Sequence, residues 1–269
     1  MGPHKGVLTP VKKNEMSKLI AFVNQKGGTG KTTSTVNVGA GLSRLGRKTL
    51  AIDLDPQANL TYHLGINSGG LKATIAEVLE GRAGIEEAIV ERDSLDVIPS
   101  TLALADTEAR IFNVTGREFL LREALAGLKR GYAYVLIDCP PSLGVLTLNA
   151  LVAVREIYIP IEAQALPLQG LRAIRDVVEL VRERLNPSLE LTGIIATKYS
   201  GRLTLNREVL GTLKEHFGDL LFKTVIRATV KLAEAPSYGQ DIFHYAPKSH
   251  GAEDYLILCK EILQREERK

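Results

Sequence analysis

The sequence contains little cysteine, no tryptophan and no long apolar run. Its two cysteines, Cys139 and Cys259, lie far apart, which excludes a disulfide framework and a C-x-x-C metal site. No apolar stretch approaches the roughly 20 residues that span a bilayer. Residues 1–16 also lack the apolar segment of a signal peptide. We therefore expect a cytoplasmic protein.

Charge and histidine content exclude further classes. The formal net charge is only +3, which leaves room for a local basic patch but does not by itself indicate a nucleic-acid partner. The five histidines are scattered without metal-ligand spacing, and no Ser-His-Asp or Cys-His set is apparent. The chemistry of this protein is therefore expected to depend on other side chains.

The chain is predicted to be an arm followed by one domain. Residues 1–17 are rich in glycine, proline and lysine and predict a flexible N-terminal arm, although a start at Met16 is an open alternative. Residues 18–269 alternate between apolar strands and amphipathic helices. The predicted strands are 19–23, 48–53, 95–98, 134–138, 156–161, 190–197 and 221–226. The predicted helices are 31–45, two short ones within 73–92, 102–129 with a break near 113–116, 145–154, 168–185, 203–217 and 251–266. This alternation predicts an α/β fold, a mostly parallel twisted sheet with helices on both faces.

The most informative stretch is Lys26-Gly27-Gly28-Thr29-Gly30-Lys31-Thr32-Thr33, between a predicted strand and a predicted helix. Glycines allow a tight turn whose N–H groups, with the helix N-terminus, can surround phosphate oxygens. Lys31 supplies charge for the β- and γ-phosphates, and the Thr32 hydroxyl is placed to ligate Mg²⁺. Gln25 stands where the usual motif has glycine, and a second lysine, Lys26, begins the loop. The sequence therefore predicts a nucleotide-phosphate site with an unusual extra lysine.

Two further segments place carboxylates at strand ends. Asp53 and Asp55 end the second predicted strand, and Asp138 ends the apolar run Val135-Leu136-Ile137 in a Walker B pattern. In parallel sheets, ligands bind at the carboxyl ends of the strands, so these carboxylates are expected to face the nucleotide. Asp138 is predicted to hold Mg²⁺ through a water, because Mg²⁺ loses its hydration shell reluctantly.

The two-lysine loop resembles the deviant Walker A motif of the ParA/MinD ATPases. The segments 232–239 and 246–253 resemble the closing segments of Soj-type partition proteins in that family. The resemblance extends over nearly the whole chain from Lys18 onward. It implies a P-loop ATPase that binds ATP and Mg²⁺, forms a homodimer with ATP, and hydrolyses ATP slowly without a partner.

The resemblance also implies roles for individual residues. Lys26 would reach across the dimer to the nucleotide of the partner subunit, Asp55 would orient the attacking water, and Asp53 would support the metal. The catalytic residues are then Lys26, Lys31 and Asp55. The nucleotide would be held by Lys26, Gly27, Gly28, Thr29, Gly30, Lys31, Thr32 and Thr33, and the metal by Thr32, Asp53 and Asp138.

The resemblance implies double-stranded DNA, bound without sequence preference, as the ligand of a basic face. Arg202 and Lys231 fall at the positions of two DNA-contacting residues of the family, and Lys198, Arg227 and Lys248 could extend the patch. Such binding needs charge rather than base-reading geometry, because it depends on counterion release from phosphates. The segment 227–229 departs from the family's usual Pro-Arg-Asn, which leaves the contacts to the nucleobase undefined.

The implied function is chromosome or plasmid segregation with a ParB-like partner on the nucleoid. A positioner of another cellular cargo would share every motif above. A MinD-like membrane-cycling ATPase needs an amphipathic C-terminal helix, whereas residues 264–269 are charged and lack a bulky apolar face, so no membrane is expected. An iron–sulfur scaffold usually needs the C-x-x-C pair that is absent.

Overall fold

A seven-stranded sheet forms the centre of the molecule in a computed structural model that describes residues 17–163 and 168–268. The strand order is β3-β2-β4-β1-β5-β6-β7, and every pair of neighbouring strands is parallel. The predicted arm at residues 1–17 lies outside the described residues apart from Ser17. The strands are β1 (Lys18–Phe22), β2 (Thr49–Asp53), β3 (Asp96–Ile98), β4 (Tyr134–Asp138), β5 (Glu156–Glu162), β6 (Glu190–Tyr199) and β7 (Leu221–Arg227).

The central strands are apolar because both of their faces are covered. In β4, Val135 and Ile137 belong to one apolar cluster, and Tyr134 and Leu136 belong to a second cluster on the opposite face. Successive strand residues point to opposite faces, so a strand buried on both sides reads as a continuous apolar run. Each such buried aliphatic side chain contributes roughly 1.5–3 kcal/mol to folding. The apolar pattern in the sequence therefore locates the middle of the sheet.

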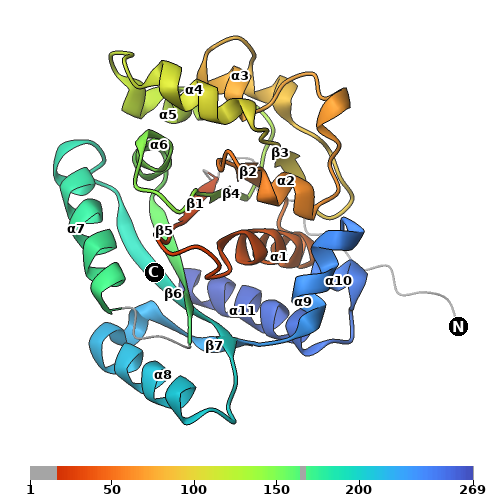
Figure 1. The fold of residues 1–269 in the computed structure, drawn as a ribbon, viewed down its shortest axis with the longest axis vertical. Helices are drawn as coiled ribbons and strands as arrows, with labels where there is room; N and C mark the ends of the chain where they lie inside the picture. The colour runs from red at the N-terminus through yellow and green to blue at the C-terminus, as the bar shows by residue number, and fades with distance from the viewer. Residues whose placement is uncertain (1–16, 164–167, 269) are drawn as a thin grey trace, which may run out of the picture.

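Helices cover both faces of the sheet (Figure 1). On one face lie the helices whose residues join the second cluster or pack beside it: α1 (Lys31–Arg44), α2 (Asn59–His63), α9 (Val230–Glu234), α10 (Ile242–Tyr245) and α11 (His250–Glu266). The other face carries α3 (Ile75–Leu79), α4 (Ala103–Ile111), α5 (Leu120–Ala126), α6 (Val145–Ala153), α7 (Leu168–Arg184) and α8 (Thr204–Phe217). Figure 1 shows α3, α4 and α5 across the strands from α1.

The predicted fold class is confirmed, and each predicted strand and long helix is present with ends that differ by a few residues. The expected break near residues 113–116 separates α4 from α5. The short helices α2, α9 and α10 were not predicted. Each is four or five residues long, too short to show a helical period in the sequence.

Within the described residues, no helix is both long enough and apolar enough to cross a membrane.

Candidate functional site

The glycine-rich loop joins β1 to α1 at the carboxyl edge of the sheet. Gly28 has φ 74° and Gly30 has φ 89°, in the left-handed region that glycine adopts without steric cost. Gly30 is the N-cap of α1, and no side chain of the described residues caps this helix. Its first N–H groups therefore point out of the helix unpaired, an arrangement suited to a phosphate.

The two lysines of the loop differ in environment. Lys31 is only 7% exposed at the start of α1, whereas Lys26 is exposed on the outer part of the loop. The backbone N–H of Lys26 donates a 3.0 Å hydrogen bond to Asn24 Oδ1. Among the described residues Lys26 forms no ion pair, so its ammonium group is available to a second molecule. The buried lysine and the exposed lysine are therefore suited to different ligands.

The three predicted carboxylates lie together. Asp53, the last residue of β2, is paired with Asp138, the last residue of β4. Phe22, the last residue of β1 before the loop, is paired with Asp138 from the other side of β4. Asp53 and Asp138 are fully buried, and Asp55 is 6% exposed. Thr32 Oγ1 donates a 2.6 Å hydrogen bond to Asp138 Oδ2. The strand order thus brings the loop and both carboxylate segments to one place.

The electrostatics of this cluster favour a bound cation. Burial, and then the neighbouring charge of Asp53, raises the pKa of Asp138 well above its usual value. Burial likewise raises the pKa of Asp53 to about 6, although hydrogen bonds from Thr61 oppose this. Lys31 lowers the pKa of Asp138, but the charge of one lysine does not balance two carboxylates that are buried together. A hydroxyl and carboxylates are the hard oxygen donors that Mg²⁺ takes, and Mg²⁺ commonly uses one or two carboxylates plus substrate phosphates. The residues present therefore fit Mg²⁺.

Within the part of the chain that the structure describes, no group of three or more His, Cys, Asp and Glu side chains could hold a metal.

Thr61 is a residue of this site that the sequence analysis missed. Its backbone N–H and its hydroxyl both donate to Asp53 Oδ2, at 2.9 and 2.7 Å, while Asp53 Oδ1 accepts from the backbone N–H of Asp55 at 3.2 Å. Asp53 is thereby oriented from α2, a helix that no sequence signal revealed. Asp55 Oδ1 accepts from the N–H of Gln57 at 2.9 Å. The predicted metal role of Asp53 and water-orienting role of Asp55 stay predictions.

The two predicted DNA-contacting residues follow neighbouring strands. Tyr199 and Arg227 pair at the ends of β6 and β7, and Arg202 and Lys231 are exposed in the segments that come next. Both residues therefore lie at the carboxyl edge of the sheet, outside the phosphate loop. Lys231 Nζ lies 2.9 Å from Glu234 Oε2, so part of its charge is compensated.

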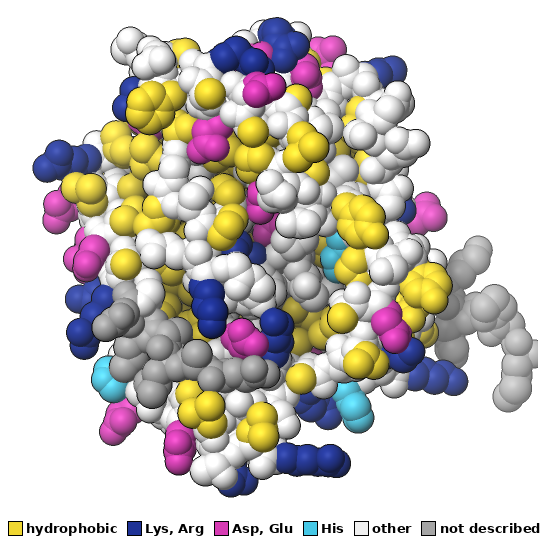
Figure 2. Space-filling model, in the orientation of Figure 1, with side chains coloured by type: hydrophobic (Ala, Val, Ile, Leu, Met, Phe, Trp, Pro, Cys, Tyr) yellow, Lys and Arg dark blue, Asp and Glu magenta, His cyan; other side chains and the backbone are white. Residues whose placement is uncertain are grey.

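The proposed extensions of the basic patch are mostly paired. The Arg227 guanidinium contacts Asp254 and Glu253 at 2.5 and 2.7 Å, and Lys198 Nζ lies 3.6 Å from Glu162. Figure 2 shows acidic side chains among the lysines and arginines of the visible face. Arg227 and Lys198 therefore add little uncompensated positive charge to the predicted patch.

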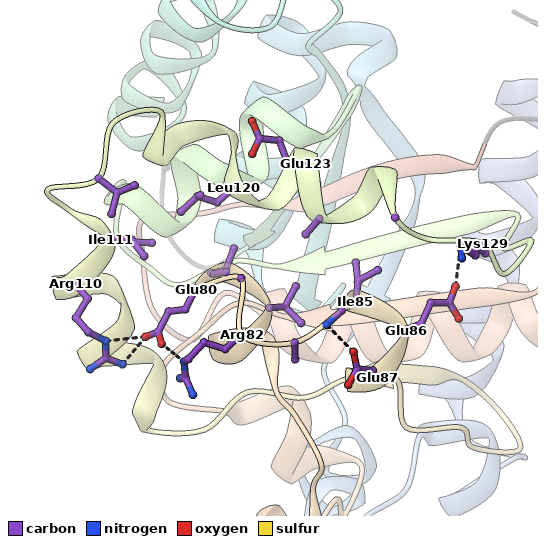
Figure 3. Close-up of a pocket in the computed structure, with 18 residues that line it drawn as sticks. Glu80, Arg82, Ile85, Glu86, Glu87, Arg110, Ile111, Leu120, Glu123 and Lys129 are labelled. Carbon is purple, nitrogen blue, oxygen red and sulfur yellow. Dashed lines mark hydrogen bonds and ion pairs between the residues drawn. The ribbon is translucent and has the colours of Figure 1, made fainter.

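A pocket of about 790 Å³ lies away from this site, between α3, α4 and α5. Ile85, Ile111 and Leu120 contribute to its apolar lining, and Glu80 at its rim is bonded to Arg82 and Arg110 (Figure 3). Its lining includes no residue of the phosphate loop or of the carboxylate cluster.

The chain is similar to a known protein family, to curated proteins and to solved structures. The AAA domain family matches residues 17–191. The chain is 42% identical over 249 residues to the sporulation initiation inhibitor protein Soj of Bacillus subtilis, with 92% of this chain and 98% of that protein covered. It is 39% identical to the chromosome partitioning protein ParA of Caulobacter vibrioides, with 93% and 95% covered. A crystal structure of cobyrinic acid a,c-diamide synthase from Mycobacterium smegmatis with bound ADP and magnesium matches with a TM-score of 0.82 at 34% identity, covering 94% and 96%.

Proposed function

This chain belongs to the AAA-domain family of Soj- and ParA-type ATPases, and on that premise we propose that it is an ATP-dependent dimerising ATPase of chromosome or plasmid segregation. We further propose that the ATP-bound dimer binds double-stranded DNA without sequence preference and that a ParB-like partner stimulates hydrolysis. The protein would then be a cytoplasmic, nucleoid-associated one.

The observation that carries the proposal is the loop with one buried and one exposed lysine beside a buried carboxylate cluster. A glycine turn alone would not require Lys31 to be buried next to Asp138. The N–H groups at the start of α1 and the Lys31 ammonium would bind the phosphates of the nucleotide. Thr32 and Asp138, which are already joined by a 2.6 Å hydrogen bond, would hold Mg²⁺ together with Asp53.

Magnesium, when bound, neutralises charge that develops on the transferring phosphate. The protein groups would do the rest. Asp55 would orient the attacking water from its nearly buried position at the end of β2. Lys26, exposed and without an ion pair among the described residues, would contact the nucleotide of the second subunit. ATP would thus complete two sites at once, which would make dimerisation depend on the nucleotide.

The dimer would also create the DNA-binding face. A single protomer offers Arg202 and a partly compensated Lys231, whereas a dimer would present two copies of each. Because counterion release scales with the number of phosphates neutralised, doubling the basic groups strongly increases affinity. DNA binding would then require ATP without any contact between DNA and nucleotide.

The test is a gel-shift measurement with random duplex DNA in the presence of ATP or ADP, run alongside light scattering to follow dimerisation. We expect retarded DNA and dimers with ATP and almost neither with ADP. Equal DNA binding with both nucleotides would contradict the nucleotide switch. Dimerisation without DNA binding in any state would instead favour a positioner of another cargo.

A further inference from the structure

The phosphate loop has little intrinsic rigidity. Three of its four residues from Gly27 to Gly30 are glycines, which have wide conformational freedom. Adding a Cβ at Gly27 would meet nothing within 4 Å, so neighbouring side chains do not enclose the loop there. Contacts from outside the loop are therefore expected to help hold its functional shape.

One such contact comes from β6. Thr197 Oγ1 donates a 2.8 Å hydrogen bond to the backbone oxygen of Thr29, which lies 168 positions earlier in the sequence. Thr197 is 3% exposed and Thr29 is 2% exposed, so water does not compete for this bond. The same hydroxyl lies 3.1 Å from the oxygen of Ile161 in β5. Since a hydroxyl has one hydrogen, the shorter contact, to Thr29, is the favoured one.

The bond determines the direction of a peptide group. The Thr29 C=O and the Gly30 N–H belong to one planar trans peptide and point in opposite directions. When the oxygen is held toward Thr197, the Gly30 N–H points away from β6, and no described residue accepts a hydrogen bond from it. Because Gly30 is a glycine at φ 89°, the reversed peptide orientation is sterically open to it as well. Thr197 removes that alternative.

The other end of the loop is held in a similar way. Asn24 Nδ2 donates to the oxygen of Pro160 in β5 at 2.7 Å, and Asn24 Oδ1 accepts from the N–H of Lys26. The loop is thus attached at its entrance to β5 and at its exit to β6. Only the attachment at the exit acts on a peptide next to the first turn of α1.

We propose that Thr197 is a positioning residue for phosphate binding, which aims the Gly30 N–H at the nucleotide by holding the carbonyl of Thr29. The proposal rests on the proposed function in one respect, namely that the loop binds a nucleotide. Thr197 touches no phosphate itself. Its loss would leave the buried carbonyl of Thr29 without its donor and would allow the peptide to turn, so the nucleotide would bind more weakly.

The test compares Thr197→Val, which keeps the shape and removes the donor, with Thr197→Ser, which keeps the donor. Thr192→Val is the matched control, because it removes a hydroxyl from the same strand whose partner is Glu156 at 2.9 Å. Titration with fluorescent ADP gives Kd, ATP hydrolysis gives KM and kcat, and thermal melting without nucleotide reports on folding. If Thr197→Val does not fold, Thr197→Ala provides the donor deletion.

We expect Thr197→Val to weaken ADP binding by roughly tenfold, a factor equivalent to about 1.4 kcal/mol. KM should rise by more than kcat falls. Thr197→Ser should bind within about twofold of the wild type, and Thr192→Val should be unchanged. Equal Kd values for wild type and Thr197→Val, or failure of Thr197→Ser to restore binding, would overturn the role of Thr197 alone. Absence of ADP binding in the wild type would overturn the proposed function together with this role.

Discussion

The hydroxyl of Thr32 donates a 2.6 Å hydrogen bond to the carboxylate of Asp138, joining the first turn of α1 to the end of β4. These two residues are 106 positions apart in the sequence, yet their oxygens lie side by side, where both could help to hold a Mg²⁺. The bond brings the Thr32 hydroxyl oxygen and a carboxylate oxygen of Asp138 together between the loop and the sheet.

The two lysines of the loop should separate binding from dimerisation. Lys31→Ala should abolish ATP binding, because it removes the buried charge beside the phosphates. Lys26→Ala or Lys26→Gln should retain some binding but lose dimerisation and hydrolysis, since Lys26 is exposed and would act on the second subunit. Light scattering with ATP measures dimerisation. A Lys26 variant that dimerises and hydrolyses normally would contradict the cross-subunit role.

Asp55→Ala should bind ATP and Mg²⁺ but hydrolyse ATP on the order of 10²–10⁴ times more slowly, the usual effect of losing a group that handles the attacking water. The dimer should then persist in ATP. Single-turnover hydrolysis is the measurement. Turnover at the wild-type rate would show that Asp55 has another role and would make Asp53 the candidate.

DNA binding should depend on Arg202 and Lys231 through charge. Arg202→Glu combined with Lys231→Glu should remove binding to random duplex and leave ATP-driven dimerisation intact, because both residues lie outside the phosphate loop. The wild-type affinity should fall steeply with salt, with a slope of about −0.9 per phosphate contacted. Gel shifts at several salt concentrations measure both effects. Unchanged binding in the double variant would place the DNA face elsewhere.

His63 should make stability depend on pH. It is 2% exposed, its Nε2 has no hydrogen-bond partner, and burial lowers its pKa from 6.5 to about 4 despite the nearby charge of Asp241. Between these values the unfolded chain binds more protons than the folded one. The free energy of unfolding is therefore unaffected by the titration of His63 above about pH 6.5. It falls as the pH drops toward 4, by up to about 3 kcal/mol.

Urea unfolding at several pH values tests this prediction. Between pH 4 and 6.5, the slope of unfolding free energy against pH should be less positive in His63→Leu than in the wild type, whereas replacing the exposed His216 with Gln should leave the slope unchanged. An unchanged slope in His63→Leu would show that other groups cause the dependence.

Because the backbone of Gly65 lies close to Gly239, replacing Gly239 should cost more stability than replacing an unobstructed glycine. A Cβ at Gly239 would lie 3.0 Å from the Cα of Gly65, and φ at Gly239 is 64°. Gly46 is the matched control, because its φ is 80° but a Cβ there meets nothing within 4 Å. Gly46→Ala should cost about 1–2 kcal/mol of stability through backbone strain. Gly239→Ala should cost roughly 1–3 kcal/mol more through overlap. Chemical denaturation of both variants measures the difference, and equal losses would contradict it.

Local patterns in the sequence predicted the strands, the long helices and the chemistry of single segments. The two-lysine loop, the aspartates after two apolar runs and the alternation of strand and helix each follow from residues close in sequence. Such patterns can be read from the sequence because the periodic direction of side chains along a strand or helix, and the backbone freedom of glycine, depend on neighbouring residues only.

The tertiary structure decided which of these segments meet. The strand order that sets β1 between β4 and β5, the support of Asp53 by Thr61, the pairing of Arg227 with Asp254 and the bond from Thr197 to the loop all join residues distant in sequence or lie in elements too short to predict. These contacts form only when separate segments pack together, and no local period encodes them. The sequence by itself therefore determined the kind of site, and the packing of the sheet decided how its groups are held.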